Sequence, residues 1–185
     1  MLEDNRFTIC VTGHRPGQLF GYDIKSSKYD KIKRVLRNTM ISISNSAYEK
    51  CGVDTFRYMS GMALGIDTIF FELALELRQS SGEFTIETAA AIPFRGQEFK
   101  WPYESRKHYH ELLEQADEII TVCKGAYEPW KLQRRNEFMV DHSDSVIAVY
   151  NGSKVGGTYN CVQYAKKLNK DITVINPRTG DISCT

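Results

Sequence analysis

The sequence predicts an α/β fold, in which a mostly parallel sheet carries helices on both faces in a doubly wound arrangement. Two observations support this class. Short apolar runs rich in β-branched residues alternate with segments of helical periodicity along the chain, and the runs are almost continuously apolar, as expected of strands covered on both sides. The 185 residues show no linker, repeat or low-complexity segment, so we expect a single domain spanning residues 1–185.

The first two strand–helix units are the most regular. The runs Phe7–Thr12 and Thr55–Ser60 are expected strands. Between them, apolar residues from Tyr29 to Ala47 repeat every three or four positions, and Ile66–Leu77 forms a second apolar stripe of the same kind. Both helices are therefore expected to pack on the sheet.

The rest of the chain continues the alternation with weaker helical patterns, the last of which ends at Asn169 in a C-terminal capping position. The further expected strands are Phe84–Ile92, Glu118–Cys123, Ser145–Tyr150 and Ile172–Ile175, and the further expected helices are Tyr103–Ala116, Leu132–His142 and Asn160–Leu168.

Composition narrows the classes of partner. The formal net charge is only +1, from 24 basic and 23 acidic residues, so no overall field attracts nucleic acid or an anionic membrane. The five cysteines form no C-x-x-C pair, which argues against a disulfide framework or a metal site. We find no leader pattern and no apolar stretch of the roughly 20 residues that span a bilayer. These features indicate a cytoplasmic protein with no membrane partner.

Distinctive turn residues follow five of the expected strands. In a parallel sheet the carboxyl ends of the strands meet at one edge, where ligands bind. We therefore expect the ligand site at this edge. The five segments are "TGHRPGQLFG" (12–21), "SGMALGID" (60–67), "PFRGQ" (93–97), "CKGAYEPW" (123–130) and "YNGSKVGGT" (150–158).

Two of these segments have the chemistry of an anion site. "SGMALGID" and the "GGT" of residues 156–158 each open a helix after a strand, and each pairs glycine with a hydroxyl, Ser60 or Thr158. Glycine allows a ligand close to the backbone, and the free N–H groups of a helix start attract phosphate. The alternative is that the glycines only make tight turns and the hydroxyls only cap helices. Neither a P-loop nor a G-x-G-x-x-G signature is present.

Four ordered motifs resemble a known superfamily. "SGMALGID" resembles a stretch of the DNA-processing protein Smf/DprA, and Arg135–Thr158 resembles a region of LOG-type phosphoribohydrolases. Those families define the SLOG superfamily, a Rossmann-like group. Within it, "TGHRP", "SGMALGID", "QRRNEFMVDHSD" and "GGTYNCVQYA" are most similar to the YpsA-like family, and the similarity extends from Phe7 to Pro177.

The resemblance implies a nucleotide or a nucleotide-derived ligand, such as NAD, ADP-ribose or an AMP-like nucleoside monophosphate, with no firmly implied cofactor. We expect a ligand-binding protein or sensor. SLOG relatives often self-associate, so a homo-oligomer is compatible with the resemblance.

Two alternative functions remain. The first is LOG-like cleavage of an N-glycosidic bond, with Arg135 matching the LOG arginine. However, Cys161 occupies the position of the LOG glutamate, and a thiol does not replace a carboxylate that steadies positive charge. The second is binding of single-stranded nucleic acid through the basic stretch Lys25–Arg37. We prefer to interpret this stretch as the solvated face of a helix.

The candidate site combines backbone and side-chain groups. Arg135 and Asp67 are the candidate catalytic residues. Arg135 matches the LOG arginine. Asp67, in the first turn of its helix, would either accept a hydrogen bond from a ribose hydroxyl or support the backbone of the loop. Arg15 and Arg95 are candidate phosphate clamps. His14 would donate to a ligand or hold its turn in place. The predicted ligand-binding residues are Gly13, His14, Arg15, Ser60, Gly61, Gly65, Asp67, Arg95, Arg135, Gly156, Gly157 and Thr158.

Aromatic residues are also candidates for the site. Tyr127 and Trp130 lie in the segment after the fourth expected strand, where either would stack on a base. Packing at the rim of the core is the competing interpretation.

Overall fold

The computed structural model describes residues 6–80 and 82–184. Within them, seven strands form one sheet in the order β4-β3-β2-β1-β5-β6-β7, and every neighbouring pair is parallel except β6 and β7. The strands are β1 (Arg6–Gly13), β2 (Thr55–Ser60), β3 (Thr85–Ile92), β4 (Glu118–Thr121), β5 (Ser145–Val149), β6 (Asp171–Ile175) and β7 (Ile182–Cys184).

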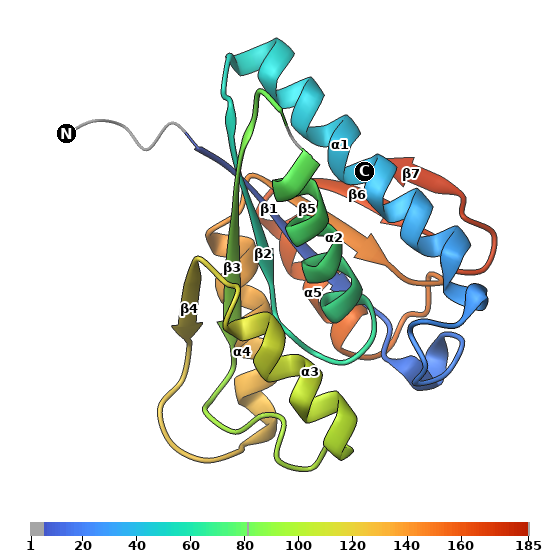
Figure 1. The fold of residues 1–185 in the computed structure, drawn as a ribbon, viewed down its shortest axis with the longest axis vertical. Coiled ribbons are helices and arrows are strands. Elements are labelled where there is room, and N and C mark those ends of the chain that lie inside the picture. The colour runs from blue at the N-terminus through green and yellow to red at the C-terminus, as the bar shows by residue number, and fades with distance from the viewer. Residues whose placement is uncertain (1–5, 81, 185) are drawn as a thin grey trace.

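Helices cover both faces of this sheet, with α1, α2 and α3 on one side and α4 and α5 on the other (Figure 1). The predicted fold class, a doubly wound and mostly parallel Rossmann-like sheet, is confirmed. The helices are α1 (Asp30–Cys51), α2 (Ile66–Ser80), α3 (Tyr103–Leu113), α4 (Pro129–Asp141) and α5 (Gly157–Lys167), with short 3-10 turns η1 (Pro16–Gln18) and η2 (Ser27–Tyr29).

Side-chain alternation along the central strands explains why both faces are covered. In β1, Ile9 and Val11 belong to the core under α1 and α2, whereas Cys10 between them belongs to the core under α4 and α5. In β5, Ile147 belongs to the core under α1 and α2, and Val146 belongs to the core under α4 and α5. A strand that is apolar at every position has to be covered twice, because successive side chains point to opposite faces.

Several boundaries differ from the sequence-based expectation by up to three residues; α3 ends at Leu113 rather than Ala116, and α4 begins at Pro129 rather than Leu132. The fourth strand ends at Thr121, and the edge strand β4 is largely exposed. Helix α5 begins at Gly157, three residues before the expected start. Strand β7 was not expected, because it contributes only three exposed residues to the sheet. The predicted capping residue Asn169 has a φ of 52°, the left-handed conformation of a helix end.

The order of the strands places a topological switch between β1 and β5. The chain leaves β1 toward β2, β3 and β4 on one side, and β5 and β6 extend the sheet on the other. Ligands of such sheets bind outside the carboxyl ends of the strands at this switch. None of the helices in the described part of the chain has the length and apolar character needed to cross a membrane.

Candidate functional site

Loops that follow β1, β2 and β5 meet at the carboxyl edge of the sheet. The backbone N–H of Ile66 donates to the His14 carbonyl over 3.4 Å. The His14 ring, which is buried, lies 3.1 Å from Oδ1 of Asn151 in the loop after β5. His14 therefore holds the first loop against the other two, which agrees with the structural role considered for it.

The loop after β2 is closed by its own hydroxyl groups. Ser60 Oγ donates to the Asp67 carbonyl over 2.7 Å and accepts from the Met62 N–H at 3.1 Å. Thr68 Oγ1 donates to the Ala63 carbonyl over 2.9 Å. Ser60 has no exposed surface, so its hydroxyl proton is used inside the loop rather than offered at the edge.

Arg135 and Asp67, the two candidate catalytic residues, form a buried ion pair. Nη1 of Arg135 lies 3.6 Å from Oδ2 of Asp67 and also donates to the Gly61 carbonyl, while Nε donates to Asn136 Oδ1 over 2.9 Å. Burial raises the pKa of the Asp67 carboxyl, and the charges of Arg135 and Arg15 oppose that shift. The ion pair joins α4 to the first turn of α2, and the hydrogen bond to Gly61 joins α4 to the loop after β2 across 74 positions of sequence.

One nitrogen of the Arg135 guanidinium, Nη2, takes no part in these contacts. Within residues 6–80 and 82–184, Nη2 of Arg135 makes no hydrogen bond. It is not counted among the fully buried side-chain polar atoms without a partner, of which Nε of Arg106 is the single example in these residues. Nη2 of Arg135 is therefore an unpaired donor among the described residues, although the residue as a whole is only 4% exposed. A guanidinium placed in this way retains a donor for an incoming anion.

Three predicted glycines lie against neighbouring parts of the chain. A Cβ at Gly61 would overlap the Arg135 guanidinium, and a Cβ at Gly13 would lie 2.5 Å from Cβ of Ile66. Gly65 has a φ of 102°, and its Cβ would lie 2.6 Å from the His14 carbonyl oxygen. These glycines allow segments of the protein to approach one another closely.

The glycines after β5 have different surroundings. Gly156 has a φ of 97° and open space where a Cβ would be, and a Cβ at Gly157 would meet only Asn136 Nδ2, at 3.9 Å. Both are exposed. Gly156 is the N-cap of α5 and supplies no side-chain cap, so the first turn of α5, which includes Thr158, has N–H groups without a capping side chain.

Arg15 and Arg95, the predicted phosphate clamps, are both exposed, on the loops after β1 and β3. The charge of Arg15 acts on both Asp67 and Arg135, so Arg15 lies near that pair. Arg95 lies on a different loop from Arg15, the one after β3. The structure therefore ties Arg15 to the Arg135 region.

Cys161 lies behind this edge. Its side chain has no exposed surface, and burial raises the pKa of the thiol to about 12, against an opposing hydrogen bond with Thr12. A neutral, enclosed thiol cannot act in place of the LOG glutamate.

An exposed set of aromatic side chains occupies the far part of the same edge. We name Phe99, Tyr103, Tyr127 and Trp130 the aromatic rim; their exposed fractions are 74%, 67%, 56% and 55%. They lie on the loops after β3 and β4 and on the first residues of α3 and α4. The ring of Tyr127 packs edge-on against Phe94, 5.6 Å away, which joins the two loops.

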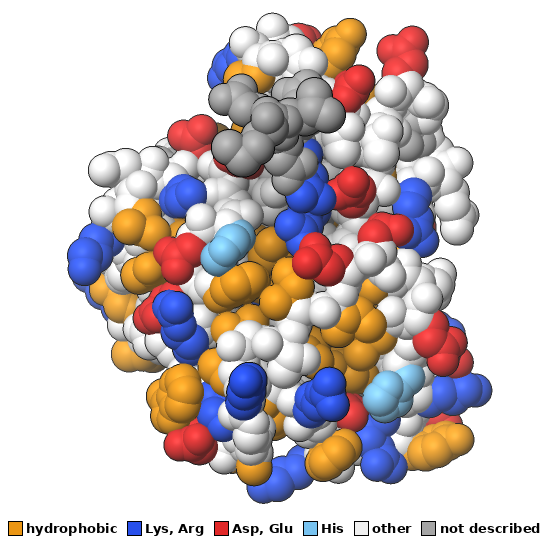
Figure 2. Space-filling view, turned by 90° about the vertical axis from the view of Figure 1, so that its left-hand side faces the viewer, with side chains coloured by type: hydrophobic (Ala, Val, Ile, Leu, Met, Phe, Trp, Pro, Cys, Tyr) orange, Lys and Arg blue, Asp and Glu red, His pale blue; other side chains and the backbone are white. Residues whose placement is uncertain are grey.

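Basic side chains accompany the aromatic rim. Arg95, Lys100 and Lys124 are exposed on the same two loops. Figure 2 shows Lys and Arg side chains alternating with hydrophobic ones at the lower end of the molecule, where these loops lie in Figure 1. The sequence had raised Tyr127 and Trp130 as candidates for stacking on a base, with packing at the rim of the core as the alternative, whereas Phe99 was not raised. The signal for it was an aromatic residue in a polar turn, next to Lys100.

Comparison with known proteins adds family relationships. The YpsA family model, described as "YspA SLOG family", matches residues 9–179. The SPbeta prophage-derived protein YoqJ of Bacillus subtilis is 37% identical over 123 residues, which cover 60% of this chain and 70% of YoqJ. The UPF0398 protein BH1768 of Halalkalibacterium halodurans is 31% identical over 176 residues, covering 91% of this chain and 87% of that protein.

Two solved structures share the fold. DNA processing protein A (DprA) of Streptococcus pneumoniae superposes with a TM-score of 0.58 at 18% identity, over 92% of this chain and 50% of the other, so this chain spans half of that protein. DprA of Helicobacter pylori, whose structure is described for its single-stranded DNA binding mode, superposes with a TM-score of 0.56 at 19% identity, over 95% of this chain and 67% of the other.

Proposed function

We propose that this chain, which belongs to the YpsA family of SLOG proteins, binds a phosphate-bearing nucleotide or nucleotide-derived ligand at the carboxyl edge of its sheet. The observation that carries the proposal is the open glycine turn at residues 156–157, placed at the uncapped start of α5 and beside the Arg135 segment.

The start of α5 supplies the anion-binding groups. Gly157 and Thr158 begin the helix, and the N–H groups of its first turn have no partner within the helix. These donors, together with the positive end of the helix dipole, favour a phosphate. Because no side chain fills the space at Gly156, a phosphate can approach this backbone closely.

Charge around the turn favours the same ligand. Asn136 Nδ2 donates to the Gly157 carbonyl over 3.5 Å, and the Asn136 side chain also accepts from Arg135 Nε. This connects the glycine turn to the guanidinium, whose Nη2 is unpaired. Arg15 adds an exposed positive charge close to Arg135. An anionic group between the turn and these arginines would gain charge-assisted hydrogen bonds.

The geometry supports binding better than the LOG-like reaction. Asp67 is the carboxylate next to Arg135, but it is buried and accepts from the Ala63 N–H at 3.4 Å. Cys161 is enclosed. Neither group supplies an accessible carboxylate for hydrolysis of a glycosidic bond, so we propose a ligand-binding protein or sensor.

Native mass spectrometry of the purified protein with AMP, NAD and ADP-ribose tests this function. We expect bound, unchanged nucleotide, and we expect Gly157→Val to reduce binding at least tenfold because its side chain would block the turn. Gly17→Val is the matched control, since Gly17 is also exposed and has open space around it. Full binding by Gly157→Val would refute the placement, and release of free base would favour the hydrolase.

The aromatic rim favours a second candidate, the binding of single-stranded nucleic acid. Exposed aromatic side chains beside Arg95, Lys100 and Lys124 form the combination that stacks bases and neutralises phosphates. The described binding mode of the H. pylori DprA, which shares this fold, is a further reason to test it.

Fluorescence anisotropy with a labelled oligothymidine tests the second candidate. Replacing both Tyr127 and Trp130 with alanine should weaken binding of the oligothymidine by at least tenfold, because stacking contributes about 1–3 kcal/mol per base. Tyr48→Ala is the control, since Tyr48 is an exposed aromatic residue in the last turn of α1. Binding that is equal in all three proteins, or that does not fall as salt is raised, would contradict this candidate.

A further inference from the structure

A hollow of about 460 Å³ lies between α3 and the turn that follows β3. Two exposed residues of the aromatic rim, Phe99 and Tyr103, line it together with charged side chains of that turn and of α3. Its volume lies within the range of about 300–1,000 Å³ that is usual for small-molecule sites, so it has room for a nucleic-acid base. The charged residues that line it are Glu98, Arg106, Lys107, His110, Glu111 and Glu114.

Glu98 brings a buried carboxylate to this hollow. The residue is only 5% exposed, yet its carboxylate accepts no hydrogen bond from any group in residues 6–80 and 82–184. Its ion-pair contact is with His110, whose Nε2 lies 3.6 Å from Oε1, a separation too long for a hydrogen bond. Burying a carboxylate without donors costs free energy. Glu98 therefore retains acceptor sites for donors that the described part of the chain does not supply.

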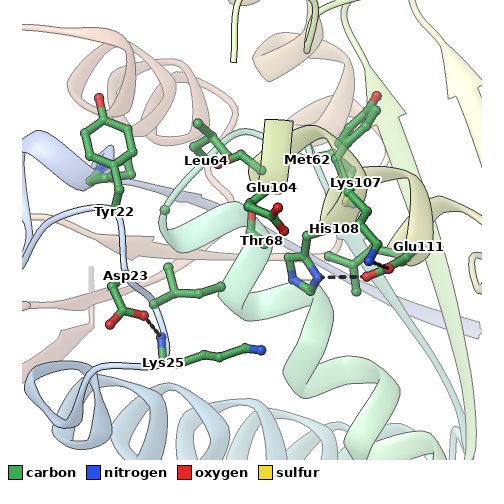
Figure 3. Close-up of a pocket in the computed structure, with 16 residues that line it drawn as sticks. Tyr22, Asp23, Lys25, Met62, Leu64, Thr68, Glu104, Lys107, His108 and Glu111 are labelled. Carbon is green, nitrogen blue, oxygen red and sulfur yellow. Dashed lines mark hydrogen bonds and ion pairs between the residues drawn. The ribbon is translucent and has the colours of Figure 1, made fainter. Parts of the chain in front are cut away.

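Glu72 and Glu111, two other carboxylates at α3, are better provided for. Nε2 of His108 lies 2.9 Å from Oε1 of Glu72. Glu111 contacts both Lys107 and His108, as Figure 3 shows for the neighbouring groove between α2 and α3. The side chain of Glu98 is less exposed than either of these, so it has lost more contact with water and gained less in exchange.

Arg106 brings unused donors to the same hollow. Among the described residues its side chain makes no hydrogen bond or ion pair, and its Nε is buried without a partner. An ionised carboxylate only accepts hydrogen bonds, and a guanidinium only donates them. A hollow that holds one of each, both without hydrogen-bond partners, matches a ligand that presents donors and acceptors side by side.

Guanine is the base that matches this pair of groups. Its N1–H and N2–H₂ are adjacent donors, which fit the two oxygens of a carboxylate, and its O6 and N7 are acceptors that suit arginine. Adenine and cytosine carry an acceptor next to the amino group, and thymine carries one donor between two acceptors. Each of these three would therefore place a lone pair against the carboxylate.

The ring of Phe99 gives the base a surface on which to stack. A Cβ at Gly96 would lie 2.6 Å from this ring, so the ring is held against the backbone of the turn. Phe99 is nevertheless 74% exposed. An exposed aromatic ring that is fixed in place can stack on a base without first having to be ordered.

We propose that the hollow binds an unstacked guanine of a single-stranded nucleic acid, which donates from N1–H and N2–H₂ to Glu98 and stacks on Phe99 or Tyr103. This inference rests on the second candidate function, the binding of single strands at the aromatic rim, and adds a base preference to it. A strand is favoured over a free nucleotide because Arg95 and Lys100 are exposed on the same turn, where they can neutralise the phosphates of a chain.

Fluorescence anisotropy with labelled oligothymidine, and with the same strand carrying one guanine or one hypoxanthine in its middle, tests this inference. Hypoxanthine lacks the N2 amino group, so it keeps one of the two donors of guanine. We expect the wild-type protein to bind the guanine strand about fivefold more tightly than plain oligothymidine, or better, because a bidentate contact discriminates between bases by at least this factor. The hypoxanthine strand should bind with intermediate affinity.

Two variants with the same change of charge locate the contact. Glu98→Gln keeps the size of the side chain but turns an amide donor toward the base, so it should remove the guanine preference. It should still bind plain oligothymidine, which shows that the variant is folded. Glu114→Gln is the matched control, because Glu114 lines the same hollow and is exposed, and it should keep the preference.

The outcomes separate this inference from the candidate function beneath it. Equal affinity of the wild-type protein for the three strands, or a guanine preference that persists in Glu98→Gln, would overturn the guanine site while strand binding at the aromatic rim stands. GMP that binds as tightly as the guanine strand would overturn the assignment to a strand. An absence of binding by every strand would overturn both the guanine site and the second candidate function.

Discussion

Two glycine-rich loops at the same edge of the sheet have opposite structures. The loop Ser60–Asp67 is almost fully buried, and the positions where Gly61 and Gly65 lack side chains are occupied by Arg135 and by the His14 backbone. The loop 151–158 is mostly exposed, and Gly156 and Gly157 face open space or only the end of an amide side chain. Only the second loop leaves its backbone free for a ligand.

This difference shows what a glycine motif can indicate. Glycine reports that something comes close to the backbone, and in the first loop that partner is the protein itself. The first loop therefore builds the site, because it fixes Arg135 in place, whereas the second loop is positioned to contact the ligand. The predictions below test this division of roles.

Gly61→Val should have the largest effect on stability. Its side chain would overlap the Arg135 guanidinium and break the buried contact with Asp67. Breaking such a pair costs about 3–5 kcal/mol, so we expect the free energy of unfolding in urea to fall by at least that amount. Unchanged stability would mean that the first loop is not closed by Arg135. Gly17→Val, at an open and exposed position, should cost about 0.5 kcal/mol or less.

Arg135→Met should give a loss of stability that depends on pH. Asp67 would remain buried without its partner, which costs about 3–5 kcal/mol near pH 7. Burial already raises the pKa of Asp67, and the loss of Arg135 raises it further.

The sign of this pH dependence follows from proton binding. A folded state with the higher carboxyl pKa binds the proton more tightly, so the deficit shrinks as the pH falls below the folded pKa. Urea titrations between pH 7 and pH 5 check this. The double variant with Asp67→Asn should lose the pH dependence, and a deficit that grows toward pH 5 would contradict the account.

Ser60→Ala should have a smaller effect, confined to stability. The change removes the donor to the Asp67 carbonyl and the acceptor for the Met62 N–H in a buried loop. Leaving such groups unpaired costs about 1–3 kcal/mol. Nucleotide affinity should remain near that of the wild type, because the hydroxyl is not directed at the ligand. A loss of affinity larger than the loss of stability would assign Ser60 to the ligand after all.

Thiol labelling should show that the solvent-exposed surface of the loop 151–158 does not reach Cys161 inside α5. Cys51 and Cys184 are exposed, whereas Cys161, four residues into α5, is enclosed and has its pKa raised to about 12. We expect rapid labelling of Cys51 and Cys184 at pH 8, and labelling of Cys161 only on unfolding. Fast modification of Cys161 in the folded protein, detected by peptide mass spectrometry, would reopen the interpretation that it is a reactive site residue.

The sequence predicts most of this fold because strands and helices leave local signals. The apolar runs at residues 7–12 and 145–150 alternate between two cores, and the helical stripe after Tyr29 packs as expected. Strand β7 has three exposed residues and no such signal. The "GGT" motif was expected to open the last helix, but the expected range began only at Asn160, because Gly156 and Gly157 have low helix propensity and are typical of loops.

The site is predicted less completely, because its key contacts are distant in sequence. The motifs locate the correct edge, but the meeting of Arg135 with Gly61 depends on the packing of α4 across 74 residues. No local sequence pattern distinguishes a glycine whose missing side chain leaves room for a guanidinium from a glycine whose backbone is open to a ligand. The exposure of Phe99 was equally hidden, because the position of an aromatic residue in a turn does not show whether its ring packs on the core or faces solvent.

The most direct test of the central claim compares Gly61→Ala with Gly157→Val in the same two assays, urea unfolding and nucleotide binding by native mass spectrometry. We predict that Gly61→Ala lowers the free energy of unfolding, and that Gly157→Val keeps it within about 0.5 kcal/mol of the wild type while losing at least tenfold in affinity. A Gly157→Val protein that binds nucleotide as the wild type does would contradict the account, because the open loop would then not be the ligand site.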